Sequence, residues 1–181
     1  TVLREYQVVC AKVIRRFEGH IARYFGDGLL VCFGYPFAHE DDAQRAVWAG
    51  LGIVESISGL NRRIQQARSD DFSRSGKPTT EVVATAPIRL QVRLGIHTGL
   101  VVAGDMDKGY QLESMAIVGE TPNIAARLQE LAEPDTLVIS AATYRLIAGF
   151  FECQNLGARS LKGISQPIEV YRVFRESVAR S

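Results

Sequence analysis

The chain has 181 residues, with 21 lysines and arginines against 20 aspartates and glutamates, which gives a formal net charge of +1. Its 46% hydrophobic and 23% charged residues are typical of one folded globular domain. The balanced charge excludes a strongly basic nucleic-acid arm and an acidic disordered tail. No apolar run reaches the length of a membrane span, and the N-terminus lacks the pattern of a signal peptide.

The three cysteines, Cys10, Cys32 and Cys153, are odd in number and far apart in the sequence. Neither a disulfide framework nor a zinc site is expected from this spacing. Because free thiols are typical of a reducing compartment, we expect the protein to be cytoplasmic.

Helical and strand patterns alternate in the first half of the chain. Apolar residues recur at spacings of three and four over 3–17, which predicts a helix that opens without a capping signal. We therefore expect an N-terminal piece of the domain to be missing before this helix. Apolar runs on both sides of the GDG triplet at 26–28 predict a strand hairpin over 20–33. A long amphipathic helix is predicted over 43–64, after a run of acidic residues.

The middle of the chain predicts a loop followed by strands. Residues 67–86 lack periodicity and are rich in Ser, Asp and Thr, so they predict an exposed loop. Strict alternation of apolar and polar residues predicts a half-buried strand over 88–96. Further strands are predicted over 100–103 and 115–118.

The last third mixes helices and strands again. Thr121 as N-cap and Pro122 at the first helical position open a predicted helix. A strand over 136–140, a short helix and a strand pair complete a domain spanning 1–174, and 175–181 begin a linker to a downstream module. Hairpins and crossovers together predict the α+β class, with a mostly antiparallel sheet flanked by helices.

Asp27 is the first candidate for chemistry. A carboxylate at the tip of a hairpin, between two glycines, is free to project towards a divalent cation such as Mg²⁺. In isolation, however, an Asp-Gly pair more often only makes the turn.

Asn123 and Arg127 lie four residues apart near the start of the predicted helix. This spacing places both donors on one face, at the helix end that favours anions, and such a pair suits a phosphate that gains charge in a transition state. Lys162, in a glycine-containing connection, is a further candidate phosphate ligand. Each of these residues is also compatible with an ordinary polar surface.

Other catalytic patterns are missing from the sequence. The histidines His20, His39 and His97 share no metal-ligand spacing, and His97 is predicted to be a hydrogen-bonding residue at a strand end. The chain has no P-loop, no nucleophile elbow and no zincin motif.

Four segments, taken together and in this order, resemble the class III adenylate/guanylate cyclase catalytic domain: 25–28 (FGDG), 92–99 (VRLGIHTG), 118–128 (VGETPNIAARL) and 161–163 (LKG). The resemblance covers nearly the whole chain and implies a ferredoxin-like class III cyclase fold. Residues 35–36, 39–42 and 119–123 are similar to bacterial cyclase domains that precede AAA ATPase and tetratricopeptide modules.

The resemblance implies a two-metal cyclisation of ATP to 3′,5′-cyclic AMP and pyrophosphate. Asp27 matches one of the family's two metal-binding aspartates, for Mg²⁺ or Mn²⁺. Asn123 and Arg127 match the transition-state pair, and Lys162 matches the lysine that holds the terminal phosphates. The family's active site is shared across a head-to-tail homodimer, so a second copy is an expected partner.

The resemblance also locates a purine-binding region at Arg23, Ala116 and Ile117. Arg23 takes the place of the family's base-selecting lysine, and Ala116 replaces its usual Asp or Thr partner. The resemblance to bacterial cyclases, which mostly make cyclic AMP, implies a preference for ATP over GTP. Because the alanine methyl group accepts no hydrogen bond from adenine, we expect this preference to be modest.

The family's first metal-binding aspartate lies in a strand before the opening helix. The chain does not contain that strand, and we expect the 181 residues alone to be inactive or nearly so. An alternative hypothesis is therefore a catalytically impaired, nucleotide-sensing or dimerisation module that regulates an attached ATPase. Intact Asn123, Arg127 and Lys162 favour the enzyme.

Overall fold

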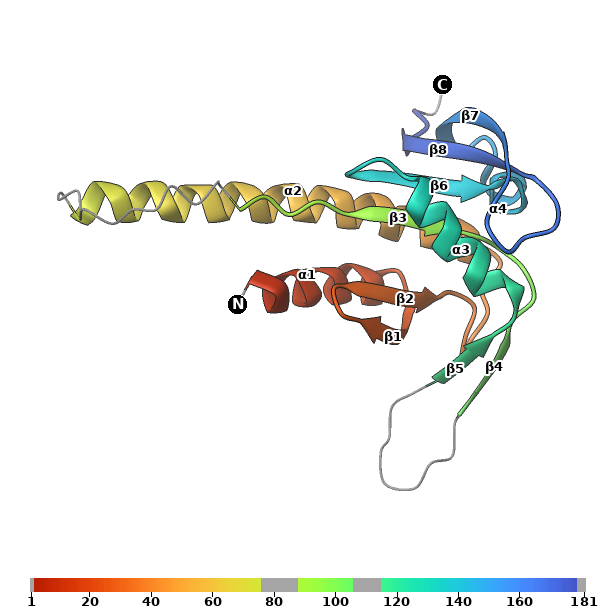
Figure 1. The fold of residues 1–181 in the computed structure, drawn as a ribbon. Helices are drawn as coiled ribbons and strands as arrows, with labels where there is room; N and C mark the ends of the chain where they lie inside the picture. The colour runs from red at the N-terminus through yellow and green to blue at the C-terminus, as the bar shows by residue number, and fades with distance from the viewer. Residues whose placement is uncertain (1, 76–87, 106–114, 179–181) are drawn as a thin grey trace.

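The computed structural model describes residues 2–75, 88–105 and 115–178, which form a mixed α+β fold (Figure 1). The class predicted from the sequence is confirmed. The elements in chain order are α1 (Val2–Arg16), β1 (His20–Phe25), β2 (Gly28–Cys32), α2 (Asp42–Ser75), β3 (Arg93–Ile96), β4 (Val102–Asp105), β5 (Met115–Val118), α3 (Glu120–Leu131), β6 (Thr136–Ser140), α4 (Ala141–Ile147), β7 (Phe151–Arg159) and β8 (Ile168–Glu176).

The main sheet has four strands in the order β3-β6-β8-β7. β3 runs parallel to β6, whereas β6 and β7 each pair with β8 in the antiparallel direction. Two antiparallel pairs, β1-β2 and β4-β5, form separate small sheets. Among the described strands, antiparallel pairing therefore predominates, as the sequence predicts.

Strand β6 is buried on both faces. Leu137 and Ile139 pack in one core cluster with residues of α2 and α4, whereas Val138 packs in another cluster with residues of α3. Side chains alternate across a strand, so this apolar run places helices on opposite faces of the sheet.

Helix α1 lies beside α2 (Figure 1) and shares a third core cluster with it. Cys10 and Ile14 of α1 contact this cluster, which also contains Ile57 and Leu60 of α2. Cys10, Cys32 and Cys153 are all free, as predicted. Within the described ranges, no helix combines the length and the apolar character needed to cross a bilayer.

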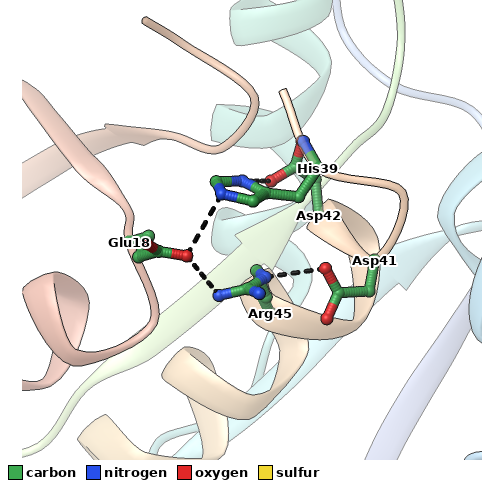
Figure 2. A network of polar contacts seen from close by, with 5 residues as sticks. All are labelled: Glu18, His39, Asp41, Asp42 and Arg45. Atoms are coloured by element: carbon green, nitrogen blue, oxygen red, sulfur yellow. Dashed lines mark hydrogen bonds and ion pairs between the residues drawn. The ribbon is translucent and has the colours of Figure 1, made fainter. Parts of the chain in front are cut away.

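A network of polar contacts joins the end of α1 to the start of α2 (Figure 2). One carboxylate oxygen of Glu18 lies 3.2 Å from Nε2 of His39 and 2.5 Å from Nη1 of Arg45. Arg45 also donates through Nε to Asp41 at 2.7 Å, and Asp42 lies 3.2 Å from Nδ1 of His39. Glu18 has a positive φ of 61° at this turn, which the Gly19 amide closes by donating to the Ile14 carbonyl at 2.9 Å.

The loop predicted over 67–86 is wrong in its first part. Helix α2 continues to Ser75, and residues 76–86 lie outside the described ranges. Residues 67–71, 73 and 74 of this extension are exposed, and contacts along the helix support it, such as Gln66 to Asp70 at 3.0 Å and Ser73 to the Ser69 carbonyl at 3.0 Å. A prediction from apolar periodicity does not detect a helical segment whose residues are mostly polar.

The strand predicted over 88–96 pairs only over Arg93–Ile96. Before it, Asn61 of α2 binds Leu90 through both its carboxamide atoms, at 2.8 Å to the amide and 2.9 Å to the carbonyl. The Val92 amide donates to the Asp135 side chain at 3.1 Å. These side chains supply hydrogen bonds that a neighbouring strand would otherwise make. The sequence before Arg93 therefore alternates apolar and polar residues without pairing in the sheet.

Smaller differences concern where elements begin and end. The predicted N-cap Thr121 lies inside α3, whose N-cap is Gly119 with a φ of 125°. The Thr121 hydroxyl instead donates to the Leu100 carbonyl at 2.6 Å. Because Leu100 lies far from Thr121 in the sequence, this contact is not visible in the local pattern that predicts an N-cap. The strand predicted over 100–103 begins at Val102, and β8 ends at Glu176 rather than at Phe174.

Candidate active site

Helix α3 sits directly on strand β3 at Gly95. A Cβ atom added at Gly95 would overlap the Ala125 carbonyl oxygen and the Gln129 amide nitrogen, so only glycine permits this approach. Ile124 and Leu128 bury the inner face of α3 in the core. The adjacent face, which carries Asn123 and Arg127, is thereby fixed relative to the sheet.

The Lys162 turn is anchored in the same core. Leu161 is buried in the cluster that contains Ile124 and Leu128, and the Ile164 amide donates to the Leu161 carbonyl at 3.1 Å. Gly163 follows Lys162 with a φ of 82°, a conformation that favours glycine. The Lys162 side chain is exposed, so Leu161 holds the turn while the lysine faces solvent.

Asn123, Arg127 and Lys162 line one open cavity of about 570 Å³. The structure therefore brings together the three residues that the sequence assigns to phosphate binding. Glu120 and Glu130 line the same cavity. The cavity thus carries two cationic side chains and one neutral amide donor that suit an anion, beside two carboxylates that balance their formal charge.

Arg127 is already paired in this structure. Its Nη1 atom donates to both carboxylate oxygens of Glu130, at 2.9 and 3.0 Å. The two residues lie three apart on the outer face of α3, a spacing that lets side chains meet. Glu130 is a functional candidate that the sequence analysis missed, although the i,i+3 spacing was a readable signal.

Asp27 occupies the tip of the β1-β2 hairpin. Phe25 pairs with Gly28, which leaves Gly26 and Asp27 as the two turn residues. Asp27 is exposed, and it makes no hydrogen bond or ion pair with another residue that the structure describes. Burial raises the pKa of the Tyr6 hydroxyl on α1, and the negative charge of Asp27 contributes to that shift. Asp27 does not line the cavity of Arg127.

The predicted purine-binding residues lie on two strands that contact each other, β1 and β5. The Arg23 guanidinium of β1 stacks over the Phe25 ring, with Cζ 4.7 Å from the ring centroid. Ala116 and Ile117 belong to β5, opposite Gly104 and Ala103. Phe25 was missed as a candidate, although residues two apart on a strand share one face.

His97 is a strand-end hydrogen-bonding residue, as predicted. Its Nδ1 lies 2.7 Å from Oγ of Ser140, which is fully buried at the end of β6. Burial lowers the pKa of His97, so the neutral imidazole is favoured. His97 and His39 line a second cavity, of about 300 Å³, between β2 and the start of α3. Within the described ranges, no group of three or more His, Cys, Asp or Glu residues is placed to hold a metal ion.

The fold and the order of these elements define a class III cyclase domain, and comparison with known proteins agrees. The model of the adenylate and guanylate cyclase catalytic domain matches residues 3–174, so the chain belongs to this family. The resemblance inferred from the four sequence segments is confirmed.

Individual relatives include both adenylate and guanylate types. The crystal structure of the adenylyl cyclase CyaB from P. aeruginosa aligns with a TM-score of 0.78 at 29% identity, covering 96% of this chain and 80% of that one. The guanylate cyclase domain of RhGC from Catenaria anguillulae, solved with GTP, aligns with a TM-score of 0.75 at 25% identity, covering 97% and 83%. The receptor-type adenylate cyclase GRESAG 4.3 of Trypanosoma brucei brucei is 28% identical in an alignment of 174 positions that covers 89% of this chain but only 14% of that protein.

Proposed function

We propose that this domain converts ATP to 3′,5′-cyclic AMP and pyrophosphate at a site shared by two copies of the chain. The observation that carries the proposal is the grouping of Asn123, Arg127 and Lys162 around one cavity on a rigid layer of α3 and the main sheet. Polar residues that merely face solvent have no need to gather around one cavity. The residues on α3 and the Lys162 turn, which lie far apart in the sequence, do so here.

In the proposed reaction, the ribose 3′-oxygen bonds to the α-phosphorus and the bond from that phosphorus to the β-phosphate oxygen breaks. The 3′-hydroxyl proton passes to solvent and pyrophosphate leaves. Arg127 and Asn123 donate to the α-phosphate as it gains negative charge, and Lys162 holds the terminal phosphates. Donors held in place by a buried helix need no reorganisation at this step, which is why the core beneath α3 matters for the chemistry.

A divalent cation, Mg²⁺ or Mn²⁺, fits the exposed carboxylate of Asp27, which has no competing ion pair in the described part of the chain. When bound, such ions neutralise phosphate charge and lower the barrier to forming the 3′-alkoxide. Asp27 supplies one carboxylate for two ions. The resemblance places the second carboxylate in a strand upstream of α1.

The proposed second copy has an apolar surface to meet. Large apolar side chains are exposed around the small sheets, with 96% of Leu100, 69% of Val102 and 55% of Val118 accessible, and Tyr24 and Phe25 of β1 are each 49% accessible. Large exposed apolar residues that gather on neighbouring strands are typical of protein interfaces. We propose that the two copies pair head to tail, as the family resemblance implies, so that Asp27 of one copy works with Arg127 of the other.

Base selection is proposed to be weak. Arg23 is engaged with the Phe25 ring, and the alanine at position 116 offers adenine no side-chain acceptor. We expect ATP to have a higher kcat/KM than GTP by about tenfold or less, the discrimination available without a dedicated hydrogen bond.

The proposal is tested by Arg127→Ala in the full-length protein. Loss of one preorganised donor is expected to lower kcat by about a hundredfold, with a smaller change in KM. An effect confined to KM would remove the transition-state role. The alternative, a nucleotide-sensing module without turnover, predicts nucleotide binding that Arg127→Ala weakens and no cyclic nucleotide from the unaltered protein.

A further inference from the structure

The proposed phosphate site contains a carboxylate that a phosphate would have to approach. Glu130 contacts Arg127 through both oxygens at 2.9 and 3.0 Å, within the cavity that Lys162 also lines. If Arg127 binds the anionic phosphates of a substrate, then the negative charge of Glu130 beside it weakens that binding. The contact therefore calls for a functional explanation beyond helix stability, to which one exposed pair contributes little.

The geometry favours an exchange of partners. The Arg127 side chain is 34% accessible and its helix is fixed on Gly95, whereas the Glu130 side chain is 60% accessible. The carboxylate is the freer of the two groups, so it can turn into solvent while the guanidinium stays at the cavity. Both of its contacts are to Nη1, an atom that a phosphate oxygen can take over.

We propose that Glu130 is a built-in competitor of the substrate, which occupies Arg127 in the empty site and is displaced by the nucleotide phosphates. The inference rests on the proposed function, because it assumes that Arg127 binds phosphate. Glu130 thus sets the affinity for the nucleotide: it weakens ground-state binding, and it takes Arg127 back when product leaves.

Glu130→Gln is the direct test, in the full-length protein, with inorganic tripolyphosphate as a probe that undergoes no cyclisation. Calorimetry is expected to show about two- to fivefold tighter tripolyphosphate binding than in the unaltered protein, the size of one exposed charge pair. The KM for ATP is expected to fall by a similar factor. The gain should shrink at high salt, because exposed charges are screened.

Glu133→Gln is the matched control. It removes the same charge three residues further on, from an exposed side chain that does not line the cavity, and it is expected to leave tripolyphosphate binding unchanged. In an Arg127→Ala background, Glu130→Gln should no longer tighten binding, because the two residues act as one unit.

The outcomes separate the two proposals. If Arg127→Ala weakens tripolyphosphate binding while Glu130→Gln leaves it unchanged or weakens it, then Glu130 does not compete, and only this inference fails. If Arg127→Ala itself leaves binding unchanged, the phosphate site is misassigned and the proposed function fails with it.

Discussion

The proposed phosphate-binding half of the candidate site and its proposed metal-binding half are built in different ways. Asn123, Arg127 and Lys162 stand on a layer whose interior includes Leu128 and Val170, both fully buried. Asp27 instead lies at the exposed tip of a two-stranded hairpin, and the neighbouring β4-β5 pair is exposed over much of its apolar surface.

This difference indicates how the site is assembled. The phosphate half is complete within one chain, because helix α3 and the Lys162 turn share one core cluster. The hairpin half presents a carboxylate and an apolar surface whose partners are not among the described residues. In the proposed shared site, the half held by α3 in one copy completes the hairpin half of the other.

The largest expected effect tests the open half. Asp27→Asn keeps a residue suited to a turn but removes the charge that a cation requires. Metal-dependent cyclase activity of the full-length protein is expected to fall to background, while the midpoint of urea unfolding stays unchanged. Full activity in the variant would mean that Asp27 only shapes the turn.

A pair of glycine substitutions compares the two halves by stability. Gly95→Ala forces a methyl group into the α3 backbone and is expected to destabilise the fold by about 3 kcal/mol. Gly104→Ala, in β4, has open space around the added atom and is the control, with an effect near zero. Equal unfolding midpoints for the two variants in urea would show that α3 is not held as closely as described.

A smaller effect concerns pH and the buried end of β3. Burial lowers the pKa of His97, so the folded state binds this proton more weakly than the unfolded chain. The contribution of the neutral His97 side chain to the free energy of unfolding is therefore complete above about pH 6.5, and it is lost as the pH falls below that value.

His97→Asn keeps a polar atom near Ser140 but cannot titrate. Between about pH 7.5 and pH 5.5, the unaltered protein should lose more unfolding free energy than this variant, as measured by urea titration. Because His20 and His39 remain in both proteins, the difference isolates His97. Equal losses would show that the imidazole is not favoured in its neutral form.

Local patterns predicted most of the elements, and non-local contacts account for the errors. The apolar periodicity of α1 and the GDG turn are short-range signals that the fold preserves. The side chains of Asn61 and Thr121 bind backbone groups far along the chain, so the start of β3 and the cap of α3 were misplaced. Neither partner is visible in a local window of sequence.

The candidate site was predictable to a similar extent. The i,i+4 spacing placed Asn123 and Arg127 on one helix face, but spacing alone gave no link to Lys162. That link came from the family resemblance, and the structure supplies its physical basis in the buried Leu161. Glu130 was missed because an acidic residue on an exposed helix face is ordinarily a surface residue.

Subunit mixing tests the shared site most directly. Full-length Asp27→Asn and Arg127→Ala proteins, each expected to retain about one per cent of the activity or less, are combined in equal amounts under conditions that let dimers exchange. Half of the dimers are then mixed and each has one intact site, so activity is expected to recover to about a quarter of that of the unaltered protein. A mixture of Asp27→Asn with the double variant is the control and stays inactive. No recovery in the first mixture, although mixed dimers form, would contradict a site in which Asp27 of one copy works with Arg127 of the other.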